Sequence, residues 1–230
     1  MLTKINLENL LFLDIETVPE TQEFNQLDIE KQELWEHKSA YQRKDDFTAE
    51  EFYHRAGIWA EFGKVVCISV GYFVFKGETR NFRVTSYYGD EIKLLKAFKT
   101  LLIEHFGQAK HLLCAHNGKE FDFPYIARRL LINGLPLPSL LNIAGKKPWE
   151  ILHLDTMELW KFGDYKNYTS LELLTHVFDI PTPKDDIDGS QVAAVYYESK
   201  DVERIAKYCE KDVVATIQLL LRYQGDPIVT

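Results

Sequence analysis

The chain has 230 residues, of which 46% are hydrophobic and 13% aromatic, so it can bury the core of one compact domain. This composition excludes a chain that is disordered over most of its length, and no apolar run is long enough to cross a bilayer. The net charge is −8, whereas proteins that grip duplex nucleic acid usually carry a basic footprint. Tight binding of duplex nucleic acid is therefore disfavoured.

The sequence shows neither the pattern of a signal peptide nor closely spaced cysteines. The apolar run 10–13 is interrupted by Asp14 and Glu16, and no cationic segment or small-residue cleavage site frames it, so we expect no signal peptide and a cytoplasmic location. The three cysteines stand apart, with no Cys-x-x-Cys pair: Cys67, Cys114 and Cys209. This spacing fits a reducing compartment and gives no support to a zinc site.

The hydrophobic pattern predicts an α/β domain. Segments rich in β-branched and aromatic residues predict strands at 10–15, 64–75, 81–88, 111–115 and 151–154, with a hairpin loop at 76–78. Helical spacing of apolar residues predicts helices at 91–106, 124–132, 156–160, 170–178, 190–198 and 202–223. This order predicts a mixed five-stranded sheet flanked by helices.

Residues 20–61 form a charged segment in which aromatic residues stand among acids and bases. The pattern predicts one or two solvated amphipathic helices on the surface. A lid or a partner-docking arm is the alternative. We expect a single domain over residues 1–230 that carries this segment as a charged helical insertion at about 20–61.

Two acids stand in the first predicted strand. Asp14 and Glu16 are two residues apart, so both side chains leave the same face of a strand. Their neighbours Phe12, Leu13 and Ile15 are apolar, which indicates a buried strand. Burying two carboxylates side by side is costly without cations, so a cation site is one interpretation and a water-exposed strand end is the other.

A third acid follows the predicted strand 111–115. Asp122 comes shortly before Pro124 and therefore fits the N-cap of the helix that begins there. Capping is the simpler interpretation of Asp122 by itself. A helix start at the carboxyl end of a strand also faces the usual ligand crevice of an α/β sheet, so a role in a site is compatible with capping.

The last predicted helix carries the fourth acid. Tyr208 and Asp212 are four residues apart and share a helix face with the apolar Ile205. Asp212 is therefore expected to point toward the core, whereas Glu210 and Lys211 suit solvated charges. An inward aspartate beside a tyrosine hydroxyl indicates a function.

Together the acids form a set of hard oxygen ligands, provided that the fold brings them together: Asp14, Glu16, Asp122 and Asp212. Such ligands suit Mg²⁺ or Mn²⁺ and not zinc. Two such ions about 4 Å apart can activate water and steady the leaving oxygen of an in-line phosphoryl displacement. The four acids therefore predict a two-metal phosphodiester hydrolase.

Three motifs, in this order, resemble the exonuclease motifs of the DEDD superfamily: Asp14-x-Glu16, Asn117-x3-Phe121-Asp122 and Tyr208-x3-Asp212. The tyrosine-bearing branch is indicated, because the histidine-bearing branch would place histidine where Lys207 stands. The chain resembles the proofreading exonuclease domain of family B DNA polymerases, and within that group the stand-alone bacterial polymerase-B-like 3′→5′ exonucleases. The stretches 12–17, 63–71 and 208–213 also match, and the similarity spans nearly the whole chain apart from 20–61.

The resemblance implies an RNase H-like fold and two divalent metal ions, Mg²⁺ or Mn²⁺. It implies that Asp14, Glu16 and Asp212 hold the metal that carries the attacking water. Asp14 and Asp122 would hold the second metal, Asp122 mainly through water. Tyr208 would orient the nucleophilic water. The implied activity is 3′→5′ hydrolysis of single-stranded DNA with release of nucleoside monophosphates.

The resemblance also implies contacts to the substrate. Asn117 and Phe121 would contact the terminal nucleotides, Phe121 by stacking or wedging. Lys184 resembles a residue of a loop that approaches the scissile phosphate, and the alternative is a solvated lysine in a turn.

Other polar residues near these motifs have structural interpretations. Asp155 begins the stretch Asp-Thr-Met-Glu at 155–158, which has the spacing of a capping box, so a helix cap is favoured over a fifth metal ligand. His116 and His153 border the same region. Each is more often a satisfied core histidine than a ligand.

Two other functions stay open. A non-catalytic RNase H-like module could hold single strands or a partner, but the four intact acids argue against it. An RNA 3′-trimming exoribonuclease similar to the RNase D group would keep the chemistry, and segment 169–174 mildly resembles that group. We expect single-stranded nucleic-acid 3′ ends as partners, DNA favoured, and no membrane association, while any polymerase or repair partner is unspecified.

Overall fold

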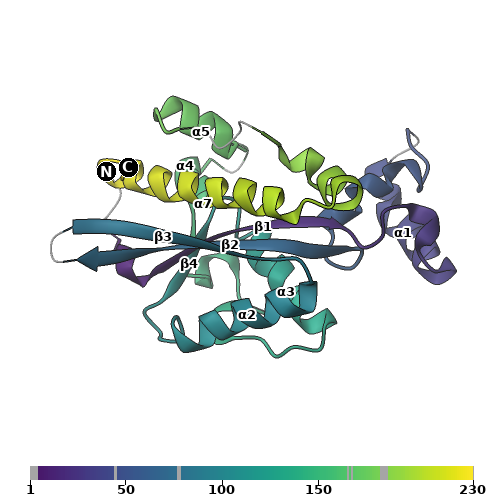
Figure 1. Cartoon of the computed structure of the whole chain (residues 1–230), viewed down its shortest axis with the longest axis horizontal. Helices are drawn as coiled ribbons and strands as arrows, with labels where there is room; N and C mark the ends of the chain where they lie inside the picture. The colour runs from purple at the N-terminus through teal and green to yellow at the C-terminus, as the bar shows by residue number, and fades with distance from the viewer. Residues whose placement is uncertain are drawn as a thin grey trace.

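A mixed five-stranded sheet with the order β3-β2-β1-β4-β5 runs through the centre of the structure (Figure 1). The structure is a computed structural model that describes residues 5–43, 46–76, 79–164, 166, 168–181 and 186–229. The strands are β1 (Leu10–Pro19), β2 (Gly63–Lys76), β3 (Thr79–Tyr88), β4 (Leu112–Ala115) and β5 (Leu154–Asp155). The β1–β2 and β2–β3 pairs are antiparallel, whereas β4 runs parallel to both β1 and β5. The predicted mixed sheet is confirmed.

Helices cover both faces of this sheet. In Figure 1, α7 (Val202–Gln224) and α5 (Leu171–Val177) lie on one side of the sheet, while α2 (Glu91–Glu104) and α3 (Asp122–Ile132) lie on the other. Three further α-helices are α1 (Ile29–Arg43), α4 (Thr156–Lys161) and α6 (Val192–Ala194). Short 3₁₀ helices lie at Leu7–Asn9, Phe24–Gln26, Glu51–Ile58, Ser139–Leu141, Pro148–Glu150 and Gly189–Gln191, and a π-helical turn lies at Val195–Ser199.

Strand β1 is buried on both faces, and its alternation decides where its acids point. Leu11, Leu13 and Ile15 pack into the core beneath α2 and α3. Leu10 and Phe12 pack into a second core with residues of α7. Because side chains alternate along a strand, the even-numbered Asp14 and Glu16 fall on the side of α7.

Helix α7 is the longest element and is fixed at both ends. The Asp201 carboxylate accepts a hydrogen bond from the Arg204 N–H at 3.0 Å, which caps the first turn. The helix ends at Gly225, whose φ of 77° lies in the left-handed region that glycine adopts without steric cost. Its apolar face buries Val213 and Ile217 against the sheet.

The charged segment 20–61 lies at one end of the molecule, where α1 is drawn beyond the sheet (Figure 1). It is more than a solvated surface helix, because Trp35 of α1 is completely buried. Phe52, Tyr53 and Phe62 surround the Trp35 ring and form a separate small core with it. The Trp35 indole N–H also donates to the Ala49 carbonyl at 2.7 Å.

Some element boundaries differ from the prediction. The predicted strand 151–154 is wrong by several residues, because β5 pairs with β4 only at Leu154–Asp155. The predicted helix 190–198 is broken into 3₁₀, α and π turns. The tip of the predicted hairpin loop, residues 77–78, lies outside the described residues. Along the described part of the chain, no helix combines the length and the apolar character that a membrane span requires.

Candidate active site

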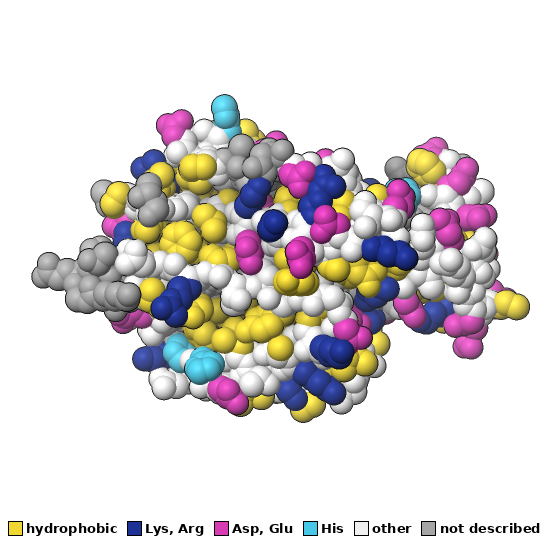
Figure 2. Space-filling model, viewed as in Figure 1, with side chains coloured by type: hydrophobic (Ala, Val, Ile, Leu, Met, Phe, Trp, Pro, Cys, Tyr) yellow, Lys and Arg dark blue, Asp and Glu magenta, His cyan; other side chains and the backbone are white. Residues whose placement is uncertain are grey.

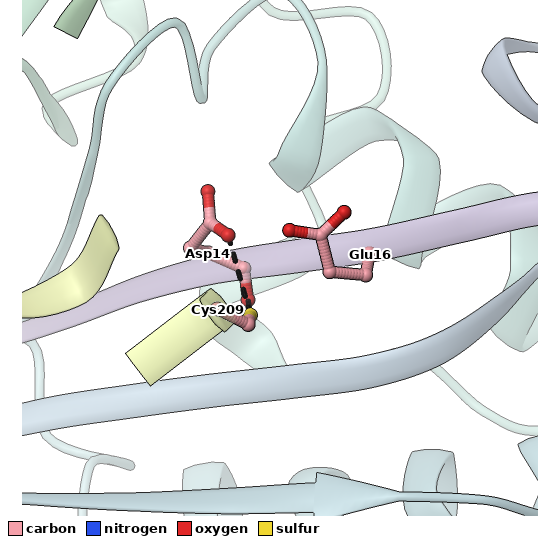
Figure 3. A group of neighbouring side chains, drawn as sticks. All are labelled: Asp14, Glu16 and Cys209. Atoms are coloured by element: carbon pink, nitrogen blue, oxygen red, sulfur yellow. Dashed lines mark hydrogen bonds between the residues drawn. The ribbon is translucent and has the colours of Figure 1, made fainter. Parts of the chain in front are cut away.

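Two acids project side by side from the middle of the sheet. The carboxylates of Asp14 and Glu16 and the thiol of Cys209 each offer one ligand atom within 4.8 Å of the others. In Figure 3 the Glu16 carboxylate points toward Asp14, and the Cys209 sulfur lies beneath Asp14. Glu16 is 8% exposed, so the interpretation of a water-exposed strand end is wrong for it.

Asp122 joins these acids from α3. Its Oδ1 accepts a hydrogen bond from the Ile15 N–H at 3.2 Å, which ties the start of α3 to the backbone between Asp14 and Glu16. The prediction that Asp122 caps α3 is wrong: the helix begins at Asp122 itself, and Phe121 occupies the N-cap position without a side-chain cap. Asp122 does not cap α3 because its carboxylate accepts a hydrogen bond from the Ile15 N–H of β1.

Helix α7 contributes Tyr208, Cys209 and Asp212 to the same region. Tyr208 is buried and Asp212 is half-buried. The negative charge of Asp212 acts on both Asp14 and Glu16, so the last acid of the sequence motif lies close to the first two. Three segments separated by about a hundred residues each therefore converge on one patch beside β1.

The acids raise one another's pKa. Burial raises the pKa of Asp14 well above its ordinary value, and the neighbouring charges of Asp212, Glu16 and Asp122 raise it further. Burial, followed by the charge of Asp212, raises the pKa of Glu16 in the same way. Burial raises the pKa of Asp122 to about 7, although hydrogen bonds from the backbone oppose this. Each of these carboxyl groups is therefore harder to ionise in the folded protein than in water.

Tyr208 and Cys209 keep their protons in this environment. Burial and the charges of Asp212 and Glu16 raise the pKa of the Tyr208 hydroxyl. Burial raises the pKa of the Cys209 thiol, and Cys209 Sγ–H donates to the Asp14 backbone oxygen at 3.3 Å and to its Oδ2 at 3.2 Å. Our sequence reasoning missed Cys209, although its place directly after Tyr208 on one helix was a usable signal.

A loop after β4 carries the two predicted substrate contacts. Asn117 has a φ of 64°, which is uncommon for a residue other than glycine, and its Oδ1 is buried without a hydrogen-bond partner among the described residues. Phe121 is half-buried, and its ring centroid lies 5.3 Å from that of Tyr125. The same loop leads directly into Asp122, so both residues lie next to the acid cluster in the chain.

The structural interpretation of Asp155 is confirmed. Its carboxylate caps α4 by accepting from the Met157 and Glu158 N–H groups, at 3.0 and 3.3 Å. It also accepts from the N–H groups of Asn117 and Lys119, at 2.9 and 3.1 Å. Asp155 is therefore a buried residue that fixes the backbone of the loop after β4 through hydrogen bonds.

The two histidines of this region are also satisfied, as predicted. His116 Nε2–H donates to the Thr169 carbonyl at 3.0 Å, and its Nδ1 lies 2.9 Å from Thr156 Oγ1. His153 Nε2–H donates to the Leu140 carbonyl at 2.7 Å, and its Nδ1 accepts from an N–H of β4. Burial lowers the pKa of both rings, which favours the neutral form. The predicted contact Lys184 lies outside the described residues.

The carboxylate oxygens of this cluster suit divalent cations as ligands. Among the described residues, the Glu16 carboxylate receives no hydrogen bond, and Asp14 receives only the weak thiol donor. Buried carboxylates that lack donors are stabilised by bound cations, and hard oxygen ligands suit Mg²⁺ or Mn²⁺. The arrangement can therefore concentrate positive charge at one point of an otherwise acidic protein.

The rest of the visible surface is not basic. On the face shown in Figure 2, Lys and Arg side chains lie among Asp and Glu side chains, and the drawn, coloured atoms form no extended basic area. This agrees with the net charge of −8. A polyanionic ligand would therefore depend on local cations and on stacking.

The fold and the acid cluster define an RNase H-like α/β domain of the kind found in polymerase-associated exonucleases. A family model described as "Predicted 3'-5' exonuclease related to the exonuclease domain of PolB" matches residues 58–225, so the chain belongs to this family. The matched residues include Asp122, Tyr208 and Asp212, whereas Asp14 and Glu16 precede them.

Individual relatives agree with this membership. A DNA polymerase of Pyrococcus glycovorans is 23% identical over 190 residues, which are 75% of this chain and 24% of the polymerase. The family B DNA polymerase from the hyperthermophilic archaeon Pyrobaculum calidifontis superposes with a TM-score of 0.61 at 15% identity, over 94% of this chain and 24% of that chain. At this identity the superposition shows the fold alone. The chain spans about a quarter of the length of these two polymerases.

Proposed function

We propose that the chain is a 3′→5′ exonuclease of the tyrosine-bearing DEDD type that acts on single-stranded DNA. It would hydrolyse the terminal phosphodiester bond, release a nucleoside 5′-monophosphate and leave a 3′-hydroxyl on the shortened strand. The observation that carries the proposal is the convergence of acids from β1, α3 and α7 beside a buried tyrosine. Family membership supports the reaction class, and the DNA polymerase relatives favour DNA over RNA.

The acids would divide between two cations, Mg²⁺ or Mn²⁺. Asp14, Glu16 and Asp212 would hold one cation, and Asp14 and Asp122 would hold the other. When bound, such a pair supplies a water of lowered pKa and neutralises charge on the phosphate. The Ile15 N–H fixes the orientation of the Asp122 carboxylate, and the Cys209 thiol does the same for Asp14.

Tyr208 would orient the attacking water. Its hydroxyl stays protonated because burial and the surrounding carboxylates raise its pKa, so it can both donate and accept a hydrogen bond. It would therefore position the water and not remove its proton.

Residues of the loop after β4 would hold the end of the strand. Phe121 would stack on or wedge against the terminal base. Asn117 would offer its Oδ1 as an acceptor, since this atom has no hydrogen-bond partner among the residues that the structure describes. Lys184 is proposed to approach the scissile phosphate on the resemblance alone.

We also propose that residues 1–230 are one exonuclease domain with an insertion at about 20–61. The start of the family match at residue 58 and the separate core around Trp35 support this division.

The test is hydrolysis of matched DNA and RNA strands, with free or blocked 3′ ends, in Mg²⁺ or Mn²⁺. The purified protein should release mononucleotides from free 3′ ends of single-stranded DNA, and the Asp14→Ala variant should not. Undiminished hydrolysis by Asp14→Ala would end the proposal. Binding of labelled strands without any shortening would instead favour the non-catalytic module.

A further inference from the structure

A cleft of about 490 Å³ lies against the loop that carries the predicted substrate contacts, because Lys119 and Glu120 of that loop line it. Three lysines line it, Lys119, Lys146 and Lys161, together with the apolar side chains of Pro148, Ile151 and Met157. Four acids also line it, and each already has a partner in the protein: Glu120, Asp155, Glu158 and Asp164. Asp155 also lines the cleft while holding the Asn117 N–H, so one residue joins the cleft to the loop beside the acid cluster. The cleft lining and the loop that leads to Asp122 are therefore joined through Asp155.

Two large aromatic rings stand in solvent at residues adjoining the cleft lining. Trp149, next to Pro148, is 75% exposed, and Phe162, between Lys161 and Gly163, is 78% exposed. Phe162 has a φ of 44°, a left-handed conformation that is rare and strained for a bulky residue. The left-handed conformation ends α4, where Phe162 is the C-cap, and the Phe162 ring centroid lies 6.3 Å from that of Trp160. The Trp149 and Phe162 rings nevertheless stay mostly exposed to solvent.

The lysines of the cleft are able to reach an anion. Lys119 pairs with Glu158 and Lys161 pairs with Glu120 at 3.8 Å, but both glutamates are far more exposed than the lysines and are free to swing away. Lys147 Nζ lies 5.2 Å from the centre of the Trp149 ring. Within the described part of the chain, Lys146 makes no ion pair. Cations interleaved with exposed rings are the recognition pattern of single-stranded nucleic acid.

We propose that this cleft holds the nucleotides that precede the 3′ end of a single strand, with bases stacked on Trp149 and Phe162 and phosphates paired with Lys146, Lys147 and Lys161. This rests on the proposed function and extends it, because it assigns a strand-binding track outside the acid cluster. Stacking and phosphate contacts do not read base identity, so the track is sequence-independent. A duplex would not use it, because its bases stack on each other.

The experiment separates strand binding from chemistry. Fluorescence anisotropy with a labelled eight-nucleotide dT strand, in Ca²⁺, measures the Kd of the wild type and of Trp149→Ala/Phe162→Ala and Lys146→Glu/Lys147→Glu. The double variant Lys93→Glu/Lys96→Glu on α2 is the matched control, because both lysines are exposed and neither lines the cleft. Thymidine 5′-monophosphate 4-nitrophenyl ester, which is too short to enter the cleft, reports the chemistry alone.

Both cleft variants should weaken binding of the dT strand by about tenfold or more, while the α2 control should not. Hydrolysis of the nitrophenyl ester should stay within about twofold of the wild type in every variant. An unchanged Kd in the cleft variants, or an equal loss on the ester, would overturn the assignment. A wild type that binds through the cleft but hydrolyses neither substrate would contradict the proposed function and leave the strand-binding track standing.

Discussion

Two groups of acids in the central part of the molecule differ in the hydrogen-bond donors that they receive. Asp155, at 2% exposed, receives four backbone N–H groups from two segments of the chain. Glu16 and Asp122 are buried and Asp14 is half-buried, but these three acids receive few donors and raise one another's pKa. The difference teaches that burial alone does not mark a functional carboxylate, whereas burial without donors does.

Glu91 on α2 is a third acid whose hydrogen-bond partners can be compared. Glu91 accepts from Arg129 Nε at 2.8 Å and from the Val65 N–H at 2.8 Å, and its carboxylate also accepts from Asn133. This acid is satisfied by a cation and donors of the protein itself. Within the described part of the chain, no cationic side chain pairs with Asp14, Glu16 or Asp122, so an added cation is the natural way to complete the site.

The largest effect should come from removing one unsatisfied acid. Asp14→Asn should lower kcat by on the order of a thousandfold, because it deletes a carboxylate shared by both proposed cations. Release of mononucleotides from a labelled DNA strand measures this effect. Glu203→Gln is the matched control, since Glu203 is an exposed acid on α7, and a comparable loss in that variant would contradict the assignment.

The satisfied acid should behave in the opposite way. Asp155→Ala should reduce the free energy of unfolding by roughly 2–4 kcal/mol, because several backbone N–H groups would lose a charged acceptor. Urea unfolding measures this change. Asp90→Ala removes an exposed cap of α2 that accepts from the Lys93 N–H, and it should cost only about 1 kcal/mol. Equal costs would mean that the four hydrogen bonds of Asp155 add little.

Tyr208 tests whether the site needs a positioned hydroxyl. Tyr208→Phe should lower kcat by about tenfold with little change in KM, because one hydrogen bond to the water is lost while the ring and its packing remain. The pH dependence of kcat between pH 7 and 9 should keep its shape, since the raised pKa of the hydroxyl places its titration above this range. A shifted profile would instead indicate that Tyr208 acts as a base.

The smallest effect concerns pH and metal removal. In chelator-treated protein the folded state holds the Asp122 proton up to a pKa of about 7, above the ordinary value of 3.8, so stability is greatest at low pH and falls as the pH rises through 7. We expect a loss of roughly 1 kcal/mol in the free energy of unfolding between pH 6 and pH 8. Asp14, Glu16, Asp155 and Asp212 are the charged groups facing this cluster.

Urea unfolding at the two pH values, with and without Mg²⁺, measures this dependence. Added Mg²⁺ or the substitution Asp122→Asn should reduce it, because each removes uncompensated negative charge. A chelated wild type that is more stable at pH 8 than at pH 6 would contradict the sign.

Much of this architecture was predictable from local patterns. The apolar run 10–15 predicted a buried strand, and the two-residue spacing of Asp14 and Glu16 placed both on one face of it. The buried strand is confirmed, because the two sides of β1 enter different cores. The period of 202–223 predicted a long helix that presents Tyr208 and Asp212 together. The strand β5 was misplaced because only Leu154–Asp155 pair with β4, and pairing length depends on a neighbour that the local sequence does not describe.

The sequence by itself determined where the acids stand and which face of its strand or helix each one occupies. This is possible because strand and helix periods are local properties. Tertiary structure decided which of these carboxylates receive hydrogen-bond donors from the rest of the protein. Asp122 resembled a cap and turned to the Ile15 N–H, whereas Asp155 caps its helix and also holds a loop nearly forty residues away. The physical reason is that the donors which neutralise a buried carboxylate come from distant segments, and only the folded chain brings them within hydrogen-bonding distance.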